Sequence, residues 1–254
     1  MVVEMQLIRH ATMVISINGQ QLLLDPMLGP TGSMSAVAGV RNTKDNPLVP
    51  LPVELSELTH PAAILLTHTH RDHFDAAAME VLPFTIPLFC QPNDVEKLGA
   101  AGFSQLLPVE ESQVWQGITI HRTGGQHGTG DIGQSMGPVS GFVLEAAGEP
   151  RLYITGDTIW CSEVEAALAC FQPDIVICFA GEARFSSGDP ITMGREDIDH
   201  ICRRVPRARL IVVHMEAWNH CGLSRQELQE YLQENGLADR VQVPADGDKL
   251  IFER

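Results

Sequence analysis

Short apolar runs alternate with longer amphipathic or polar stretches along this chain. The runs at residues 62–66, 88–90, 174–179 and 208–213 are rich in Ile, Leu, Val and Phe, as in strands that are buried on both faces. Residues 117–123 instead alternate apolar and polar side chains, which indicates a half-exposed strand. No run in the sequence approaches the length of a membrane span.

The N-terminal part predicts three strands, at residues 5–10, 13–18 and 20–25. The Asn18-Gly19 dipeptide between the last two tolerates positive φ and suits a two-residue hairpin turn. An antiparallel meander is therefore expected. Similar patterns predict further strands at residues 105–109, 140–146 and 151–154, and a terminal strand pair around residues 241–252.

Helical periodicity predicts five helices, at residues 75–82, 94–101, 162–170, 195–204 and 224–234. Residues 27–59 turn to Gly, Pro, Ser and Asn without periodicity, and a loop of this length is usually functional or mobile. This loop is expected to border a pocket. Periodicity alone indicates an α/β or α+β protein and nothing narrower.

Composition and charge limit the class of partner. The 254 residues are 44% hydrophobic and no linker divides them, which predicts one domain over 1–254. A net charge of −15, from 17 Lys and Arg against 32 acids, argues against nucleic acid and anionic membranes as partners. A small-molecule substrate is favoured, and a homo-oligomer is compatible with the sequence.

Targeting signals and cysteine spacing indicate a cytoplasmic protein. The first residues contain neither a basic segment nor an uninterrupted apolar segment of a signal peptide. The six cysteines form no C-x-x-C pair, which favours reduced and mostly buried thiols. Only Cys221, which follows His220, is a candidate for a place near a site.

Residues 67–75, with the sequence THTHRDHFD, place three imidazoles and two carboxylates on a turn between a buried strand and a helix. In an extended segment His68 and His70 point the same way, and Asp72 and His73 are expected to open the helix and approach from another side. Imidazole and carboxylate together are ligands of borderline metals. Four such groups exceed the needs of one tetrahedral ion, so two ions fit better.

This H-x-H-x-D-H motif, after an apolar strand, resembles that of the metallo-β-lactamase superfamily. The resemblance implies a four-layer αββα sandwich over essentially the whole chain. It also implies the remaining ligands, each near a strand end: His127 in a glycine-rich segment, Asp157 in Gly156-Asp157-Thr158, and His214 after residues 208–213. The implied centre consists of a first ion on His68, His70 and His127, a second on Asp72, His73 and His214, and Asp157 as the bridge.

Other residues are candidates for supporting the metal ligands or contacting substrate. Arg9-His10-Ala11-Thr12 is similar to the G-H-A-[ST] of a branch that includes the L-ascorbate-6-phosphate lactonases, with arginine in place of glycine. His10 is accordingly a supporting or substrate-contacting candidate, with a hydrogen-bonded core histidine as the alternative. The other candidates are Asp25, which the family uses to orient the metal loop, Trp160, which could equally be core, Glu182, Arg184, Glu216, Asn219 and His220.

The resemblance and the ligand chemistry together predict a metal-dependent hydrolase. Water shared by two divalent ions loses a proton near neutral pH, which yields a bridging hydroxide. This hydroxide would attack an ester, lactone, amide or phosphoester, while Asp72 takes up the leaving proton. This mechanism requires no serine or cysteine nucleophile. Zinc or manganese is favoured, and iron is compatible with the same ligands.

Two other activities on the same fold remain open. A phosphodiesterase of the ribonuclease Z type would act on RNA, and the acidic composition without a basic arm counts against it. An iron-dependent redox protein would be a di-iron protein or a persulfide dioxygenase. The flavodiiron branch has glutamate where this chain has His70, whereas the persulfide dioxygenase ligands overlap those given above.

Overall fold

The N-terminal meander forms as the alternating pattern predicts. In the computed structural model, which describes residues 2–253, β1 (Val2–Arg9), β2 (Thr12–Ile17) and β3 (Gln20–Leu24) pair antiparallel in sequence. The turn between β2 and β3 has φ of 48° at Asn18 and 71° at Gly19. Positive φ at both central residues is what a two-residue hairpin of this kind requires.

The meander belongs to the first of two seven-stranded sheets, whose order is β14-β1-β2-β3-β4-β5-β6. From β3 to β6 neighbouring strands are parallel, which agrees with their continuous apolar runs. The additional strands of this sheet are β4 (Ala63–Leu65), β5 (Leu88–Cys90), β6 (Leu106–Pro108) and β14 (Lys249–Glu253).

The second sheet has the order β13-β12-β11-β10-β9-β8-β7. It is parallel from β10 to β13 and antiparallel from β7 to β10. Its strands are β7 (Ser112–Trp115), β8 (Ile118–Thr123), β9 (Gly141–Ala146), β10 (Leu152–Ile154), β11 (Ile175–Phe179), β12 (Arg209–Val213) and β13 (Val241–Gln242).

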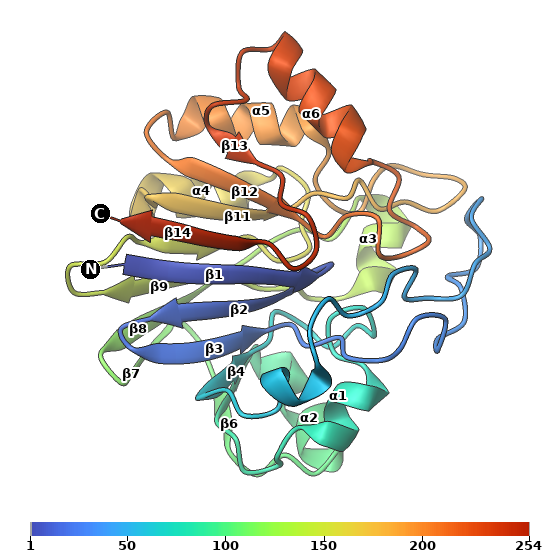
Figure 1. Ribbon diagram of the computed structural model, residues 1–254. Helices are drawn as coiled ribbons and strands as arrows, with labels where there is room; N and C mark the ends of the chain where they lie inside the picture. The colour runs from blue at the N-terminus through green and yellow to red at the C-terminus, as the bar shows by residue number, and fades with distance from the viewer. Residues whose placement is uncertain (1, 254) are drawn as a thin grey trace.

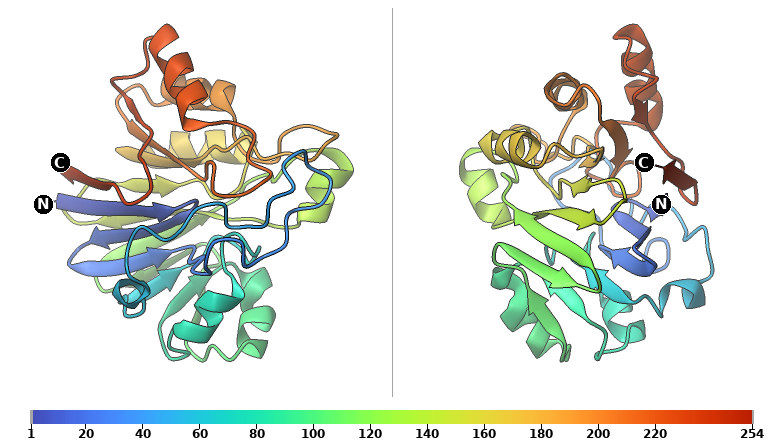
Figure 2. Two further views of the ribbon diagram at one scale, coloured as in Figure 1. Left: turned by 45° about the vertical axis from the view of Figure 1, so that its right-hand side comes forward. Right: turned by 90° about the vertical axis from the view of Figure 1, so that its left-hand side faces the viewer.

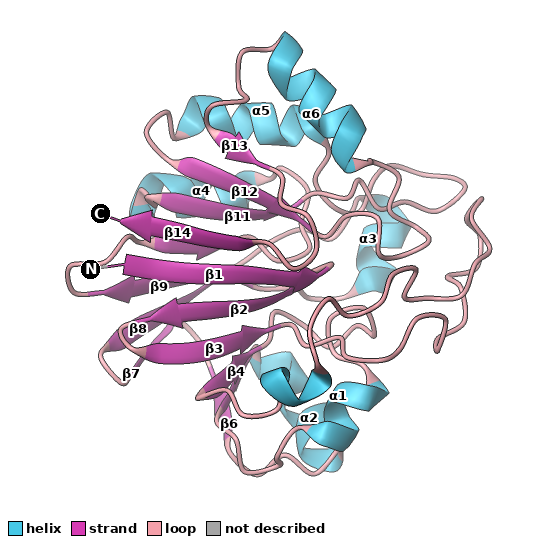
Figure 3. Cartoon of the chain, in the orientation of Figure 1, coloured by secondary structure: helices cyan, strands magenta, loops and turns pink. Residues whose placement is uncertain are grey.

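Helices cover the outer face of each sheet, which gives the expected four-layer αββα sandwich (Figures 2 and 3). The helices α1 (Ala76–Val81) and α2 (Val95–Ala100) pack on the first sheet. The second sheet carries α4 (Ser162–Phe171), α5 (Arg195–Arg204) and α6 (Arg225–Glu234). Helix α3 (Gly130–Met136) and the short 3-10 helices η1 (Leu55–Leu58) and η2 (Pro92–Asp94) lie in connecting segments.

Three apolar clusters hold these layers together. The inner faces of the two sheets share one cluster that includes Leu7, Ile120 and Phe179. The outer clusters lie between each sheet and its helices. Because both sheets contribute to the inner cluster, their edges are held in fixed relative positions, and so are the loops at those edges.

The structure corrects two sequence-based expectations and adds two elements. The terminal strands do not pair with each other: β13 pairs with β12, and β14 pairs with β1 in the other sheet, because residues 243–248 carry the chain across the sandwich. Asp72 and His73 lie in a turn, and α1 begins at Ala76 with Asp75 as its N-cap. Strand β7 and the glycine-containing helix α3 were not predicted.

Buried Arg9 clamps the long loop between β3 and β4. Its guanidinium donates to the carbonyl oxygens of Met27 (2.9 Å), Gly29 (2.5 Å) and Val49 (2.9 Å). Burial lowers its pKa to about 10, with the charge of Asp75 opposing that shift, so the group stays cationic at neutral pH. This explains the arginine in place of the glycine of G-H-A-[ST].

We expect Arg9→Met to lower the free energy of unfolding by about 3 kcal/mol, because two buried carbonyl groups and one partly buried carbonyl group lose a charged donor. Urea unfolding followed by circular dichroism measures the loss. Arg203→Met is the control, since the Arg203 side chain is 75% exposed. An Arg9→Met protein as stable as this control would show that the clamp contributes nothing.

Candidate metal centre and its surroundings

The predicted ligands meet at one edge of the sandwich, where several strands end. His68 follows β4, Asp157 follows β10 and His214 follows β12. Figure 1 shows that the loops after β1, β3 and β12 gather at this edge. Because neighbouring parallel strands end on the same side of a sheet, residues far apart in sequence converge here.

His68, His70 and His127 form a first group whose ring nitrogens lie within 4.8 Å of one another. The Nε2 atom of His68 is 3.0 Å from Nδ1 of His70. His127 uses Nδ1 to donate to the carbonyl oxygen of Ile191 at 2.7 Å, which leaves its Nε2 lone pair facing the group. The three imidazoles are therefore oriented as ligands.

Asp72, His73 and His214 form a second group, and His10 joins it. The Nε2 atoms of His73 and His214 are 3.3 Å apart, and Nε2 of His214 is 3.7 Å from Oδ2 of Asp72. His10 places Nε2 3.4 Å from the same oxygen, and its ring centroid is 3.7 Å from that of His214. His10 thus lies at the centre itself, in direct contact with the predicted ligands.

Asp157 lies between the two groups. Its Oδ2 atom is 3.5 Å from Nε2 of His127 and 3.2 Å from Nε2 of His73, while Oδ1 is 3.2 Å from Nε2 of His214. The Oδ2 atom therefore faces members of both groups, and Oδ1 faces the second group. This is the position that a bridging ligand requires.

The donor set fits divalent cations. Six of the seven predicted ligands are buried and His70 is half-buried, and ring nitrogens face one another at 3.0 and 3.3 Å. Lone pairs opposed at such distances in a dry site repel each other unless a proton or cation lies between them. Imidazole and carboxylate donors suit zinc, manganese and iron.

Electrostatics in the centre favour cation binding as well. Burial alone would raise the pKa of Asp157, but the charges of His214 and His73 hold it well below its usual range. Burial would lower the pKa of His73, yet Asp157 and Asp72 raise it to about 10. The carboxylates are thus ionised, and protons compete with metal ions for the imidazoles.

Asp25 holds the metal turn from behind. Its Oδ2 atom accepts hydrogen bonds from Nδ1 of His73 at 2.8 Å and from the Thr67 hydroxyl at 2.7 Å, and its Oδ1 accepts from the Thr67 amide at 2.8 Å. Since that hydroxyl donates to Asp25, its oxygen can accept from Nδ1 of His68 at 3.1 Å. Asp25 therefore sets the ring orientation of two predicted ligands, the task expected of it.

We expect Asp25→Asn to weaken metal affinity about 10- to 100-fold, because an amide cannot accept from both Thr67 and His73 as the carboxylate does. Competition with a chromogenic chelator measures the affinity. Asp239→Asn, an exposed aspartate far from the turn, is the control. Unchanged affinity in Asp25→Asn would contradict the assignment.

The side chains of two candidates, Glu216 and Trp160, have their contacts away from the metal centre. Glu216 accepts from the Arg225 backbone at 2.8 Å and from its guanidinium at 2.6 Å, so it fixes the start of α6 and does not contact His214 or the centre. Trp160 packs against the outer core cluster of the second sheet, with its ring 5.6 Å from that of His200. Core packing, the alternative for Trp160, is what the structure shows.

Two other candidates lie beside the centre. His220 is buried, with Nε2 3.8 Å from Oδ2 of Asp72. Arg184 lines a neighbouring cavity and forms an ion pair with Glu182. Cys221 is also close, with Sγ 3.9 Å from Nδ1 of His214.

Asn219 has a role that sequence reasoning did not find. Its Nδ2 donates to the carbonyl oxygens of Asn42 (2.7 Å) and Val37 (3.1 Å), and its Oδ1 accepts from Asn46 (2.8 Å). All these partners belong to the loop between β3 and β4. Asn219 thus fastens that loop beside the centre, and only the polar density of residues 215–220 hinted at it.

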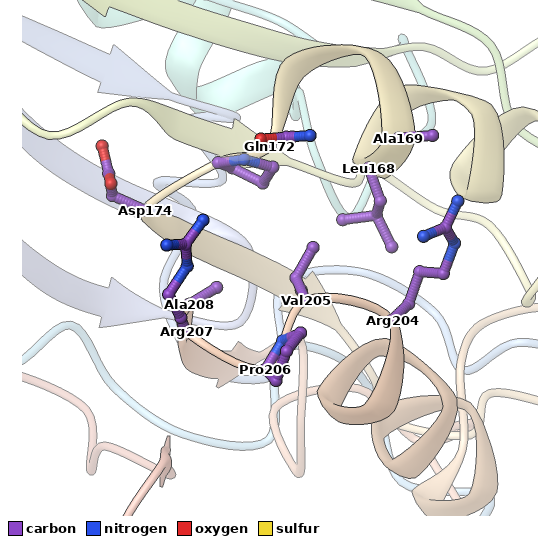
Figure 4. Close-up of a pocket in the computed structure, with 10 residues that line it drawn as sticks. Leu168, Ala169, Gln172, Asp174, Arg204, Val205, Pro206, Arg207 and Ala208 are labelled. Atoms are coloured by element: carbon purple, nitrogen blue, oxygen red, sulfur yellow. The ribbon is translucent and has the colours of Figure 1, made fainter.

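A separate cavity of about 800 Å³ lies at the opposite end of the second sheet, between α4, α5 and the starts of β11 and β12 (Figure 4). Leu168 and Val205 line it together with Arg204, Arg207 and Asp174. None of the predicted site residues contributes to it, so it is not part of the centre.

The fold and this centre define a protein of the β-lactamase superfamily class, and the profile of the family described as "Beta-lactamase superfamily domain" matches residues 20–215. The chain belongs to this superfamily and, within it, to the UPF0173 proteins. UPF0173 protein YddR of Bacillus subtilis (strain 168) is 36% identical over 249 residues, which cover 96% of this chain and 98% of that protein. A UPF0173 metal-dependent hydrolase of Rubrobacter xylanophilus is 24% identical over 95% of this chain and 93% of its own.

Solved structures agree over the full length. An isothiocyanate hydrolase from Delia radicum gut bacteria has a TM-score of 0.94 and 34% identity, covering 100% of both chains. A possible metal-dependent hydrolase from Veillonella parvula has a TM-score of 0.95 and 35% identity, covering 98% of this chain and 99% of its own. The predicted fold is thereby confirmed. Within residues 2–253, no helix is long and apolar enough to cross a bilayer.

Proposed function

We propose that this chain is a hydrolase with two divalent ions, zinc or manganese in preference to iron. The first ion is assigned to His68, His70 and His127, the second to Asp72, His73 and His214, and Asp157 to both. The position of Asp157 is the observation that carries this proposal, because its carboxylate oxygens lie 3.2 to 3.5 Å from ring nitrogens of both groups.

For the substrate, we propose a small electrophile whose carbon or phosphorus atom is attacked by water. Isothiocyanates are the first candidate substrates, because the isothiocyanate hydrolase is similar to this chain over its whole length. Water would add to the N=C=S carbon, and the products that balance are the amine and carbonyl sulfide. Esters, lactones and phosphoesters remain in the proposal, and with them the resemblance to the lactonase-like branch.

The residues of the centre have separate proposed roles. Bound ions supply Lewis acidity that lowers the pKa of water and stabilises developing negative charge. Asp25, through Thr67 and His73, keeps the ligand rings in place. Asp72 faces both His10 and His220 and is assigned to proton transfer; neighbouring charges led by His73 overcome its burial and hold its pKa well below the usual range, so it carries the proton only transiently.

Cellular setting is part of the proposal. The six cysteines carry no disulfide, which suits a reducing compartment, and we propose the cytoplasm. The proposed partner is a small-molecule substrate. We propose no nucleic acid or membrane surface as a partner, because the net charge of −15 would repel these polyanions.

The test is turnover by protein loaded separately with zinc, manganese or iron. The panel contains isothiocyanates, lactones, esters and phosphodiesters, with an RNA substrate and a persulfide as probes of the alternative activities. Turnover of an isothiocyanate or ester that disappears on chelation supports the proposal. Iron-dependent oxygen consumption with a persulfide, or RNA cleavage without small-substrate turnover, would replace it.

A further inference from the structure

A cavity of about 610 Å³ adjoins the candidate metal centre. Its walls come from residues 40–42, 182–188 and 219–222. His220 lines the cavity, and its Nε2 atom lies 3.8 Å from Oδ2 of Asp72. The volume falls in the range of about 300–1,000 Å³ that is common for ligand pockets. The cavity therefore has the size and place of a pocket that opens beside the reacting atoms.

Hydrogen bonds join the three walls to one another. The Arg184 amide donates to the His220 carbonyl oxygen at 3.0 Å. The Ser186 amide donates at 2.5 Å to the carbonyl oxygen of Gly39, which directly precedes the wall of residues 40–42. Asn219 ties the third wall through the carbonyl oxygen of Asn42 at 2.7 Å. The pocket is thus formed before any ligand enters, which lowers the entropic cost of binding.

His220 is a nearly buried residue of the pocket lining. The residue is only 7% exposed, and its Nδ1 atom has no hydrogen-bond partner among residues 2–253. Its ring lies 6.0 Å from that of Trp218, whose Nε1 contacts the Met27 sulfur at 2.7 Å. A buried nitrogen without a partner is unfavourable.

The charged groups of the pocket favour an anion. Arg41 and Arg184 both line it, although they lie far apart in sequence. Arg184 is paired with Glu182, whereas Arg41 has no ion-pair partner among residues 2–253. The lining therefore carries a net charge of +1, from Arg41 and Arg184 against Glu182. It suits a carboxylate or a similar acceptor.

We propose that this cavity binds the non-reacting side chain of the substrate and selects side chains that end in a carboxylate. In this arrangement Arg41 holds the carboxylate, with Arg184 beside it, and His220 contacts the substrate close to the reacting carbon. The inference rests on the proposed hydrolase function and deepens it. The tests below distinguish failure of the pocket from failure of the hydrolase function.

The first test compares two substrates of whichever class the wild type hydrolyses, for instance 3-isothiocyanatopropionate and propyl isothiocyanate. Arg41→Ala is expected to raise KM for the carboxylate substrate about three- to tenfold, because one exposed charge contact is lost, while kcat stays the same. For the uncharged substrate kcat/KM should change less than about twofold. Arg41→Lys should retain part of the preference, and Arg204→Ala, at the opposite end of the sheet, should retain all of it.

The second test fills the pocket. Ser187→Trp is expected to reduce kcat/KM at least about tenfold for substrates with long side chains and to spare methyl isothiocyanate, because only long side chains need the space. Thermal unfolding checks that the variant is folded. Equal losses for long and short substrates, or unchanged selectivity in active Arg41→Ala protein, would overturn the pocket and leave the hydrolase proposal standing.

A third measurement covers the case in which loaded wild type turns over nothing. The hydrolase proposal then fails, and calorimetry with 4-phenylbutyrate and 4-phenylbutanol still tests the pocket. We expect the carboxylate to bind more tightly, with the difference reduced in Arg41→Ala and binding of both lost in Ser187→Trp. Binding that neither variant changes would contradict the inference.

Discussion

Replacing Asp157 by asparagine is expected to lower kcat/KM by roughly a thousandfold, because the amide removes the negative charge that faces both groups. One oxygen is replaced by an NH₂ group, which would point a donor at His214 or at His73 and His127. Metal content, measured by mass spectrometry after gel filtration, should fall with the activity.

Asp239→Asn provides the matched control, since it makes the same chemical change at an exposed position. It should leave both activity and metal content unchanged. An Asp157→Asn protein with full metal content and wild-type kcat/KM would show that Asp157 is a buried structural carboxylate, and the proposed division into two metal positions would lose its support.

Removing the metal is expected to abolish activity and to lower the melting temperature by roughly 10 °C. A ligand at a thousand times its dissociation constant stabilises a protein by about 4 kcal/mol, and one kcal/mol corresponds to roughly 2–4 °C for a chain of this size. Lone pairs that face each other in the buried centre add to the effect. Differential scanning calorimetry before and after dialysis against a chelator measures it.

Reloading distinguishes metal loss from damage. Zinc or manganese added back should restore both the melting temperature and turnover, and lower pH should weaken the restoration, because protons compete for the imidazoles. Retention of full activity and an unchanged melting temperature after complete chelation would contradict a metal-dependent centre.

Much of the fold was predictable because its determinants are local. Asn18-Gly19 specifies its own turn, and the apolar runs at β4, β11 and β12 specify buried strands wherever they pack. Pairing partners are not local. The pattern of residues 241–252 predicted two strands. It did not show that β13 and β14 belong to different sheets, because their partners are strands far away in the sequence. The single domain over 1–254 stays a prediction.

The site shows the same division. The spacing of His68, His70, Asp72 and His73 within one turn made them recognisable as candidate ligands, whereas the contact of His10 with Asp72 depends on the register between sheet edges. The expectation that Glu216 supports the metal ligands or contacts substrate was wrong, because its carboxylate pairs with Arg225 at the start of α6. A sequence pattern cannot say which way such a side chain turns.

Metal stoichiometry tests the central claim most directly. Native mass spectrometry of the protein, expressed with ample zinc or manganese, should show two ions per chain, and His127→Ala and His214→Ala should each lose a different one in crystals read by anomalous scattering. A single ion that survives His214→Ala, or no bound ion at all, would contradict the account.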